Sequence, residues 1–125
     1  MRILYVEDDQ INAVIMRKIL ASAHRVDIAL TAEEALNAIE NGQYDLYLLD
    51  INLGHPEISG LEICQMIRDQ FPEEKKVIAV TAYSEPEDKD RFLKAGFDYY
   101  FSKPVHFQNL RQFINTLSNQ STLNP

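Results

Sequence analysis

Residues able to do chemistry follow four apolar runs of this chain. Acids at 7–9 follow the first run, Asp50 follows another, and Thr81 and Lys103 follow two more. Open α/β sheets bind ligands at the carboxyl ends of their strands, where such residues would meet. An acidic surface also favours a metal cation. The spacing therefore predicts one site at one edge of a sheet, built from acids, a hydroxyl and an ammonium group.

Five apolar runs predict strands, and each is followed by a pattern typical of a helix. The strands are expected at residues 2–6, 25–30, 44–49, 76–80 and 99–101. The helices are expected to contain residues 11–19, 35–39, 61–67, 92–95 and 107–117. Capping boxes at 31–34 and 59–62 predict two helix starts, and Gly96 predicts a helix end. Strict alternation of strand and helix predicts a doubly wound α/β sandwich with a parallel sheet and helices on both faces.

Several apolar positions are expected to form the core. The run at 76–80 is rich in β-branched residues, as in a strand that is buried on both faces. We expect Phe92, Leu93 and Ala95 on the inner face of the fourth helix, and Cys64 as a small buried hydrophobic residue. The length fits a single domain over 1–125, with a frayed polar tail over 118–125.

Composition and charge argue against several classes of protein. The chain has 125 residues, a formal net charge of −7 and one cysteine, so it forms no intrachain disulfide. Nucleic-acid binding depends on clustered Lys and Arg, which an acidic chain lacks, and no basic recognition helix is present. No stretch approaches the roughly 18 apolar residues of a membrane-spanning helix, and no signal-peptide pattern opens the chain. We expect a cytoplasmic protein that neither inserts into membranes nor binds DNA directly.

The residues Val6 to Asp9, Asp50, Thr81-Ala82 and Lys103-Pro104 together resemble the receiver domains of two-component response regulators. The resemblance covers essentially the whole chain, and the four motifs stand in the family's order and near its spacing. It implies a flavodoxin-like fold of five strand–helix pairs, with a five-stranded parallel sheet of order 2-1-3-4-5. It also implies a cis peptide bond before Pro104.

The resemblance further implies a role for each site residue. These roles are a metal-binding acidic pair at Glu7 and Asp8, a phosphoacceptor at Asp50, a metal-binding backbone carbonyl at Asn52, a switch hydroxyl at Thr81, an aromatic switch at Tyr100 and a phosphate-pairing lysine at Lys103. Clustered carboxylates repel one another unless a divalent cation neutralises them, and oxygen-only ligands suit Mg²⁺, or alternatively Mn²⁺. A carboxylate can attack phosphorus to form an aspartyl phosphate, with catalysis by in-line positioning and charge stabilisation.

Each candidate also has a structural alternative. Asp9 fits a helix cap, a lone Thr81 fits a β-branched strand residue, and Glu7 and Lys103 fit solvated side chains. Tyr100 fits a permanent core position as well as a switch, because its neighbours are also aromatic. The histidines show no ligand spacing and no acid partner, which predicts surface or loop positions for His24, His55 and His106.

The chain departs from the family pattern after the phosphoacceptor. Pro56 and Gly60 each stand two residues later than the family's usual proline and glycine, because Gly54 and His55 intervene. We expect this longer loop to alter dephosphorylation kinetics or partner fit. The resemblance also implies that Tyr83, two residues after Thr81, occupies a position that controls water access, so a bulky residue there is expected to lengthen the phosphorylated state.

The resemblance implies a signalling switch that takes phosphate onto Asp50 from a phosphohistidine on a sensor kinase or a phosphotransfer protein. A protein partner would read the face formed by the fourth helix, fifth strand and fifth helix. Any catalysis would be self-catalysed phosphotransfer from the donor and autodephosphorylation rather than metabolic chemistry. The motif at 6–9 with Asn12 is closest in style to receivers of hybrid kinases and phosphorelays.

Two other functions compete with the switch. The first is an interaction module that keeps the receiver fold and works without phosphorylation. The second is a hydrolase that forms an aspartyl phosphate on small substrates, but such enzymes place a second acid two residues after the nucleophile. Asn52 stands there instead.

Overall fold

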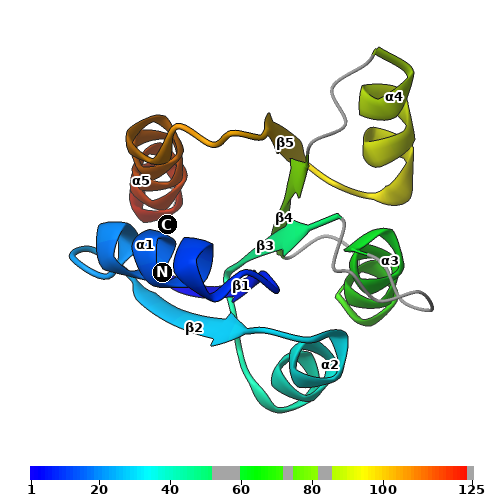
Figure 1. Cartoon of the computed structure of the whole chain (residues 1–125), viewed down its shortest axis with the longest axis horizontal. Helices are drawn as coiled ribbons and strands as arrows, with labels where there is room; N and C mark the ends of the chain where they lie inside the picture. Colours follow the sequence, from blue (N-terminus) through cyan, green and yellow to red (C-terminus); the bar gives the residue numbers. More distant parts are fainter. Residues whose placement is uncertain (52–59, 72–74, 82–85, 124–125) are drawn as a thin grey trace.

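The structure, a computed structural model, describes residues 1–51, 60–71, 75–81 and 86–123 (Figure 1). The five predicted strands are confirmed as β1 (Arg2–Val6), β2 (Arg25–Ala29), β3 (Leu46–Asp50), β4 (Lys76–Thr81) and β5 (Tyr99–Ser102). The helices are α1 (Gln10–Leu20), α2 (Ala32–Asn41), α3 (Gly60–Gln70), α4 (Pro86–Ala95) and α5 (Phe107–Leu123). Strand and helix alternate along the chain, as the apolar patterns predict.

The strands form one parallel sheet of order β2-β1-β3-β4-β5, which confirms the expected topology. Helices α1 and α5 lie on one side of this sheet, and α2, α3 and α4 lie on the other (Figure 1). Each face of the sheet therefore has its own hydrophobic core. Because β1, β3 and β4 are covered on both sides, their side chains are almost continuously buried, as expected for the central strands of a parallel sheet.

The helix starts follow local hydrogen bonding. The Asp9 side chain caps α1 by accepting from the backbone N–H groups of Ile11 and Asn12, at 2.9 and 3.1 Å. The Thr31 hydroxyl accepts from the Glu34 N–H at 3.1 Å and caps α2. The Glu34 carboxylate reaches back to the N–H of Leu30, one residue before the cap, so the predicted capping box forms in a slightly shifted version.

Two expectations about helix faces and length differ from the structure. Leu93, expected on the inner face of α4, is 45% exposed, while its neighbour Phe92 is fully buried. Consecutive helical residues point about 100° apart, so a narrow contact face buries only one of them. Helix α5 continues to Leu123, so residues 118–123 are helical rather than a frayed tail. The sequence from 107 to 123 contains no proline or glycine that would end the helix.

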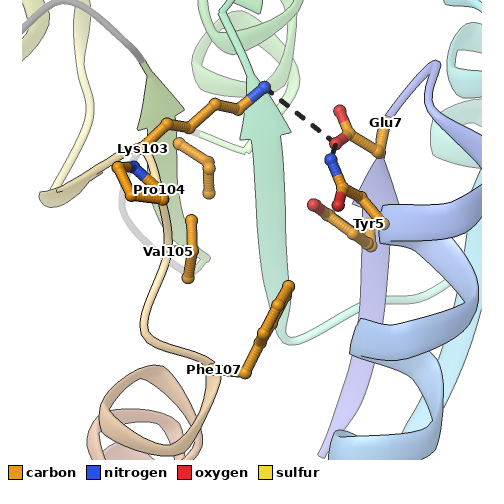
Figure 2. A pocket seen from close by; sticks show the side chains of 8 residues that line it. Tyr5, Glu7, Lys103, Pro104, Val105 and Phe107 are labelled. Atoms are coloured by element: carbon orange, nitrogen blue, oxygen red, sulfur yellow. Dashed lines mark hydrogen bonds and ion pairs between the residues drawn. The ribbon is translucent and has the colours of Figure 1, made fainter.

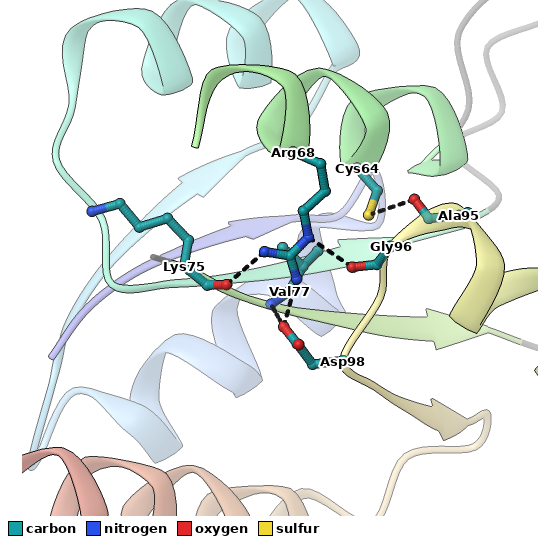
Figure 3. Close-up of polar contacts among 7 residues, drawn as sticks. All are labelled: Cys64, Arg68, Lys75, Val77, Ala95, Gly96 and Asp98. Carbon is teal, nitrogen blue, oxygen red and sulfur yellow. Dashed lines mark hydrogen bonds and ion pairs between the residues drawn. The ribbon is translucent and has the colours of Figure 1, made fainter. Parts of the chain in front are cut away.

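An arginine on α3 ties together the elements at the amino edge of the sheet (Figure 3). The Arg68 guanidinium donates to the backbone carbonyls of Gly96 and Lys75, at 2.8 and 2.7 Å, and to the Asp98 carboxylate at 2.6 Å. Asp98 also accepts from the Val77 N–H at 2.9 Å. Gly96 has φ of +109°, a conformation that favours glycine, and ends α4 as predicted. These contacts fix the turn between α4 and β5 against α3 and β4.

Candidate functional site

The strand order brings the predicted chemical residues to one edge of the sheet. Glu7 follows β1, Asp50 ends β3, Thr81 ends β4 and Lys103 follows β5, and these four strands are consecutive neighbours. Backbone hydrogen bonds continue past the strand ends, from Glu7 N–H to Ala29 O at 3.0 Å and from Lys103 N–H to Thr81 O at 2.7 Å. The site residues are therefore held on the rigid sheet.

The side chains of Lys103, Asp50 and Glu7 meet at this edge. Lys103 Nζ donates to Asp50 Oδ2 at 3.0 Å and lies 4.0 Å from Glu7 Oε1. Figure 2 shows the lysine reaching over the strand ends toward Glu7. Both residues line a pocket of about 170 Å³. Tyr5, Val105 and Phe107 line the apolar part of this pocket. The peptide bond between Lys103 and Pro104 is cis, as the resemblance implies.

The acids of the site are buried to different degrees. Glu7 and Asp50 are 0% and 1% exposed, whereas Asp8 is exposed. Burial, and next the Asp50 carboxylate beside it, raises the pKa of Glu7 to about 8. Burial alone would lower the pKa of Lys103, but its hydrogen bond to Asp50 and the surrounding acids outweigh this effect and raise it. Lys103 is therefore charged, and a further positive charge beside Glu7 would favour the ionised form of Glu7.

The acidic cluster has the composition of a site for a hard divalent cation. Glu7, Asp8 and Asp50 each offer a carboxylate oxygen, and the three oxygens lie within 4.8 Å of one another. Glu7 Oε2 is buried and receives no hydrogen bond from any described residue. An oxygen-only donor set with an unpaired buried oxygen fits Mg²⁺ or Mn²⁺. The residues present can therefore hold such a cation.

Other predicted residues lie near this cluster, in the core, or outside the described part of the chain. Thr81 is 1% exposed at the end of β4. Tyr100 is half-buried on β5, with its ring centroid 6.2 Å from that of Phe92, and does not line the pocket. The predictions for Asn52, the longer loop with Gly54, His55 and Pro56, Ala82 and Tyr83 concern residues that the structure does not describe.

The cysteine, the helix-capping aspartate and two of the histidines lie outside the cluster of site residues. Cys64 is buried as expected, with Sγ 3.6 Å from Ala95 O. Asp9 caps α1. His106 is exposed, whereas His24 lies in the loop after α1 but is buried, with Nε2 2.7 Å from Asn115 Oδ1. His24 thus has a side-chain partner that its sequence neighbours do not reveal.

Sequence reasoning missed one contact within the cluster. Asn12 Nδ2 donates to Glu7 Oε1 at 3.2 Å, and Asn12 also lines the pocket. The sequence signals were its place in the first turn of a helix that starts directly after the acids and its part in the motif at 6–12, and neither predicts a contact with Glu7. Gly60 was noted for its spacing, and the structure adds that a Cβ there would lie 2.5 Å from Asp50 O.

No helix in the described part of the chain is both long enough and apolar enough to cross a membrane.

Several large apolar side chains of the described residues are exposed. On its outer surface, α1 exposes Ile11, Val14 and Ile15, at 72%, 53% and 37%. Leu93 and Tyr99 are exposed near a groove between α4, β5 and α5. Exposed apolar side chains therefore lie on α1, which begins next to the acidic cluster, and on the face formed by α4, β5 and α5.

Comparison with known proteins gives a consistent result. The family model described as "Response regulator receiver domain" matches residues 3–115. The aerobic respiration control sensor protein ArcB of Escherichia coli K12 is 36% identical over 117 residues, which cover 91% of this chain and 15% of that protein. The polar-differentiation response regulator DivK of Brucella ovis is 34% identical, over 92% of this chain and 91% of its own.

Solved structures show the same relationship. A CheY-like response regulator receiver domain protein from Methanospirillum hungatei superposes with a TM-score of 0.86 at 34% identity, over 99% of this chain and 98% of its own. The BeF3-activated receiver domain of DrrB gives a TM-score of 0.85 at 31% identity, over 94% and 97%. The chain spans only about 15% of the length of the ArcB proteins that it matches. It belongs to the family of response regulator receiver domains of two-component systems.

Proposed function

We propose that this receiver domain is a phosphoryl-accepting switch whose phosphoacceptor is Asp50. The observation that carries the proposal is the buried Asp50 carboxylate, paired with Lys103 Nζ at 3.0 Å inside a cluster of acids. A nucleophilic carboxylate, an ammonium group and a cation-binding acidic pair are the groups that phosphoryl transfer to an aspartate requires. We also propose that residues 1–125 form a single receiver domain. The family match over residues 3–115 supports this proposal.

The proposed donor is a phosphohistidine on a histidine kinase or on a histidine phosphotransfer protein. An Asp50 carboxylate oxygen attacks phosphorus and forms the new O–P bond. The P–N bond breaks, and its electron pair returns to the imidazole nitrogen of the donor. Lys103 pairs with a phosphoryl oxygen as charge moves onto Asp50. The relationship to ArcB, a sensor protein, and to DivK, a response regulator, supports this type of partner.

The proposed cation is Mg²⁺, or alternatively Mn²⁺. The carboxylates of Glu7, Asp8 and Asp50 would hold it, together with the backbone carbonyl of Asn52, which lies outside the described residues. When bound, it would neutralise the negative charge that gathers where phosphate meets the acids. Three acidic side chains face the one positive charge of Lys103, and a bound cation would favour the ionised form of all three, which supports this assignment.

The proposed output runs through Thr81 and Tyr100. The Thr81 hydroxyl would move toward the phosphoryl oxygens, and Tyr100 would fill the space it leaves, which changes the α4–β5–α5 face. Tyr100 is half-buried on β5, so its side chain is neither fully enclosed nor fully exposed. Exposed apolar side chains on this face, Leu93 and Tyr99, support a protein partner rather than DNA. A Tyr100 rotamer that is the same with and without phosphate would contradict this route.

The test is phosphate incorporation from acetyl phosphate, followed by intact mass. The wild type should gain one phosphoryl group in Mg²⁺ and none in EDTA, and Asp50→Asn should gain none. Asp90→Asn, an exposed aspartate on α4, is the matched control and should behave as the wild type. Absence of both phosphate incorporation and Mg²⁺ binding would refute the proposal and favour an interaction module that works without phosphorylation.

A further inference from the structure

The first turn of α1 presents Asn12 to the acidic cluster. Asp9 caps this turn by accepting from the Asn12 backbone N–H at 3.1 Å, so the backbone of Asn12 is fixed close to the strand end. The Asn12 side chain is half-buried and donates through Nδ2 to Glu7 Oε1 at 3.2 Å. Its backbone and side chain thus make separate hydrogen bonds to two neighbouring acids.

The two carboxylate oxygens of Glu7 have different surroundings. Oε1 accepts from Asn12 and lies 4.0 Å from Lys103 Nζ. Oε2 is buried and receives no hydrogen bond from any described residue. The carboxylate torsion of a glutamate is broad and nearly two-fold, so nothing intrinsic to Glu7 keeps its oxygens in these places. The Asn12 amide orients the Glu7 carboxylate, because a hydrogen bond to Oε1 also fixes the direction of Oε2.

We propose that Asn12 is a positioning residue for the cation site, holding Glu7 Oε1 so that Oε2 remains available to the cation or to a water bound to it. The inference rests on the proposed function, because it assumes that the acidic cluster binds a divalent cation. Asn12 is neutral and therefore adds a hydrogen bond without a positive charge that would repel the cation. Hydrogen bonds from outside the ligand shell commonly tune metal affinity in this way.

The test is direct Mg²⁺ titration by calorimetry, which needs no phosphorylation. Asn12→Leu keeps a similar size and removes the donor, and it should weaken Mg²⁺ binding about tenfold. Asn12→Ala should give the same loss and provides a second variant if leucine disturbs α1. Asn41→Ala is the matched control and should bind Mg²⁺ as the wild type does. Asn41 Nδ2 also donates a hydrogen bond, to Asn37 O at 2.9 Å, but on α2.

A double-mutant cycle separates positioning from a general effect on the helix. In a Glu7→Gln background, Asn12→Leu should cause no further loss of Mg²⁺ affinity, because its effect passes through Glu7. An equal loss in both backgrounds, or Asn12 variants that bind Mg²⁺ as tightly as the wild type, would overturn the role of Asn12 and leave the proposed function intact. A wild type that binds no Mg²⁺ would overturn the cation site itself, and this inference with it.

Discussion

Replacing Lys103 with methionine should destabilise the metal-free protein by about 2–3 kcal/mol. At 3.0 Å, and with an effective dielectric constant of about 20, the attraction between Lys103 Nζ and Asp50 is about 5.5 kcal/mol. Glu7 adds little near neutral pH, because its pKa is raised to about 8 and it is largely protonated. The Lys103 side chain is 31% exposed, so solvent screening and recovered hydration reduce the Coulomb value to roughly half.

Urea denaturation in EDTA and in saturating Mg²⁺ measures this effect. A bound cation replaces the missing positive charge, so Mg²⁺ should stabilise Lys103→Met more than the wild type and shrink the difference between them. Lys89→Met, at an exposed position on α4, serves as the control and should change stability by less than about 0.5 kcal/mol. The electrostatic reasoning fails if Lys103→Met matches the wild type in EDTA, or if the loss is equal in EDTA and Mg²⁺.

Three further predictions use the same protein. Glu7 in the folded state binds its proton more tightly than in the unfolded chain, so its stabilising contribution is complete below pH 4.5 and is lost as the pH rises to about 8. In EDTA the melting temperature of the wild type should therefore fall relative to Glu7→Gln over this range, and parallel curves would contradict the assignment. Gly60→Ala places a Cβ 2.5 Å from Asp50 O, so it should cost about 1–3 kcal/mol in urea denaturation and slow phosphate incorporation from acetyl phosphate. Unchanged stability together with an unchanged rate of phosphate incorporation would show that the backbone around Asp50 can shift to accept the added Cβ without an energetic cost. Arg68→Met removes three hydrogen bonds and should cost about 2–3 kcal/mol in urea, whereas Arg91→Met, at an exposed ion pair, should cost less than about 0.5 kcal/mol; equal losses would refute this ranking.

The elements were predictable because their apolar patterns are strong, but the orientation of α1 was not. Ile11, Val14 and Ile15 recur at helical spacing and correctly indicate a helix, yet they are exposed. Ala13 and Met16, at the same type of spacing, are the residues that face the core. When apolar residues occur on most sides of a helix, their spacing still indicates a helix but does not show which side faces the core. That side is decided by the elements that pack against the helix.

The placement of the site residues was predictable for a different reason. Residues that end parallel strands share one sheet edge whatever the side-chain packing, so Glu7, Asp50, Thr81 and Lys103 could be grouped from the strand pattern alone. The contact between Asn12 and Glu7 could not, because it depends on the rotation of α1 and on a side-chain torsion. Sequence patterns thus place backbone positions well and individual hydrogen bonds poorly.

The strand order has a consequence for folding. The site is assembled from residues 7, 50, 81 and 103, so no short fragment of the chain contains it. A ligand that contacts all four segments binds only when β1, β3, β4 and β5 are paired, so its binding energy stabilises these four strands together rather than one local unit. Contacts over such sequence distances carry a larger loop-closure cost than the contacts within one helix. Occupancy of this edge therefore requires that β1, β3, β4 and β5 have all come together, although they are far apart in the sequence.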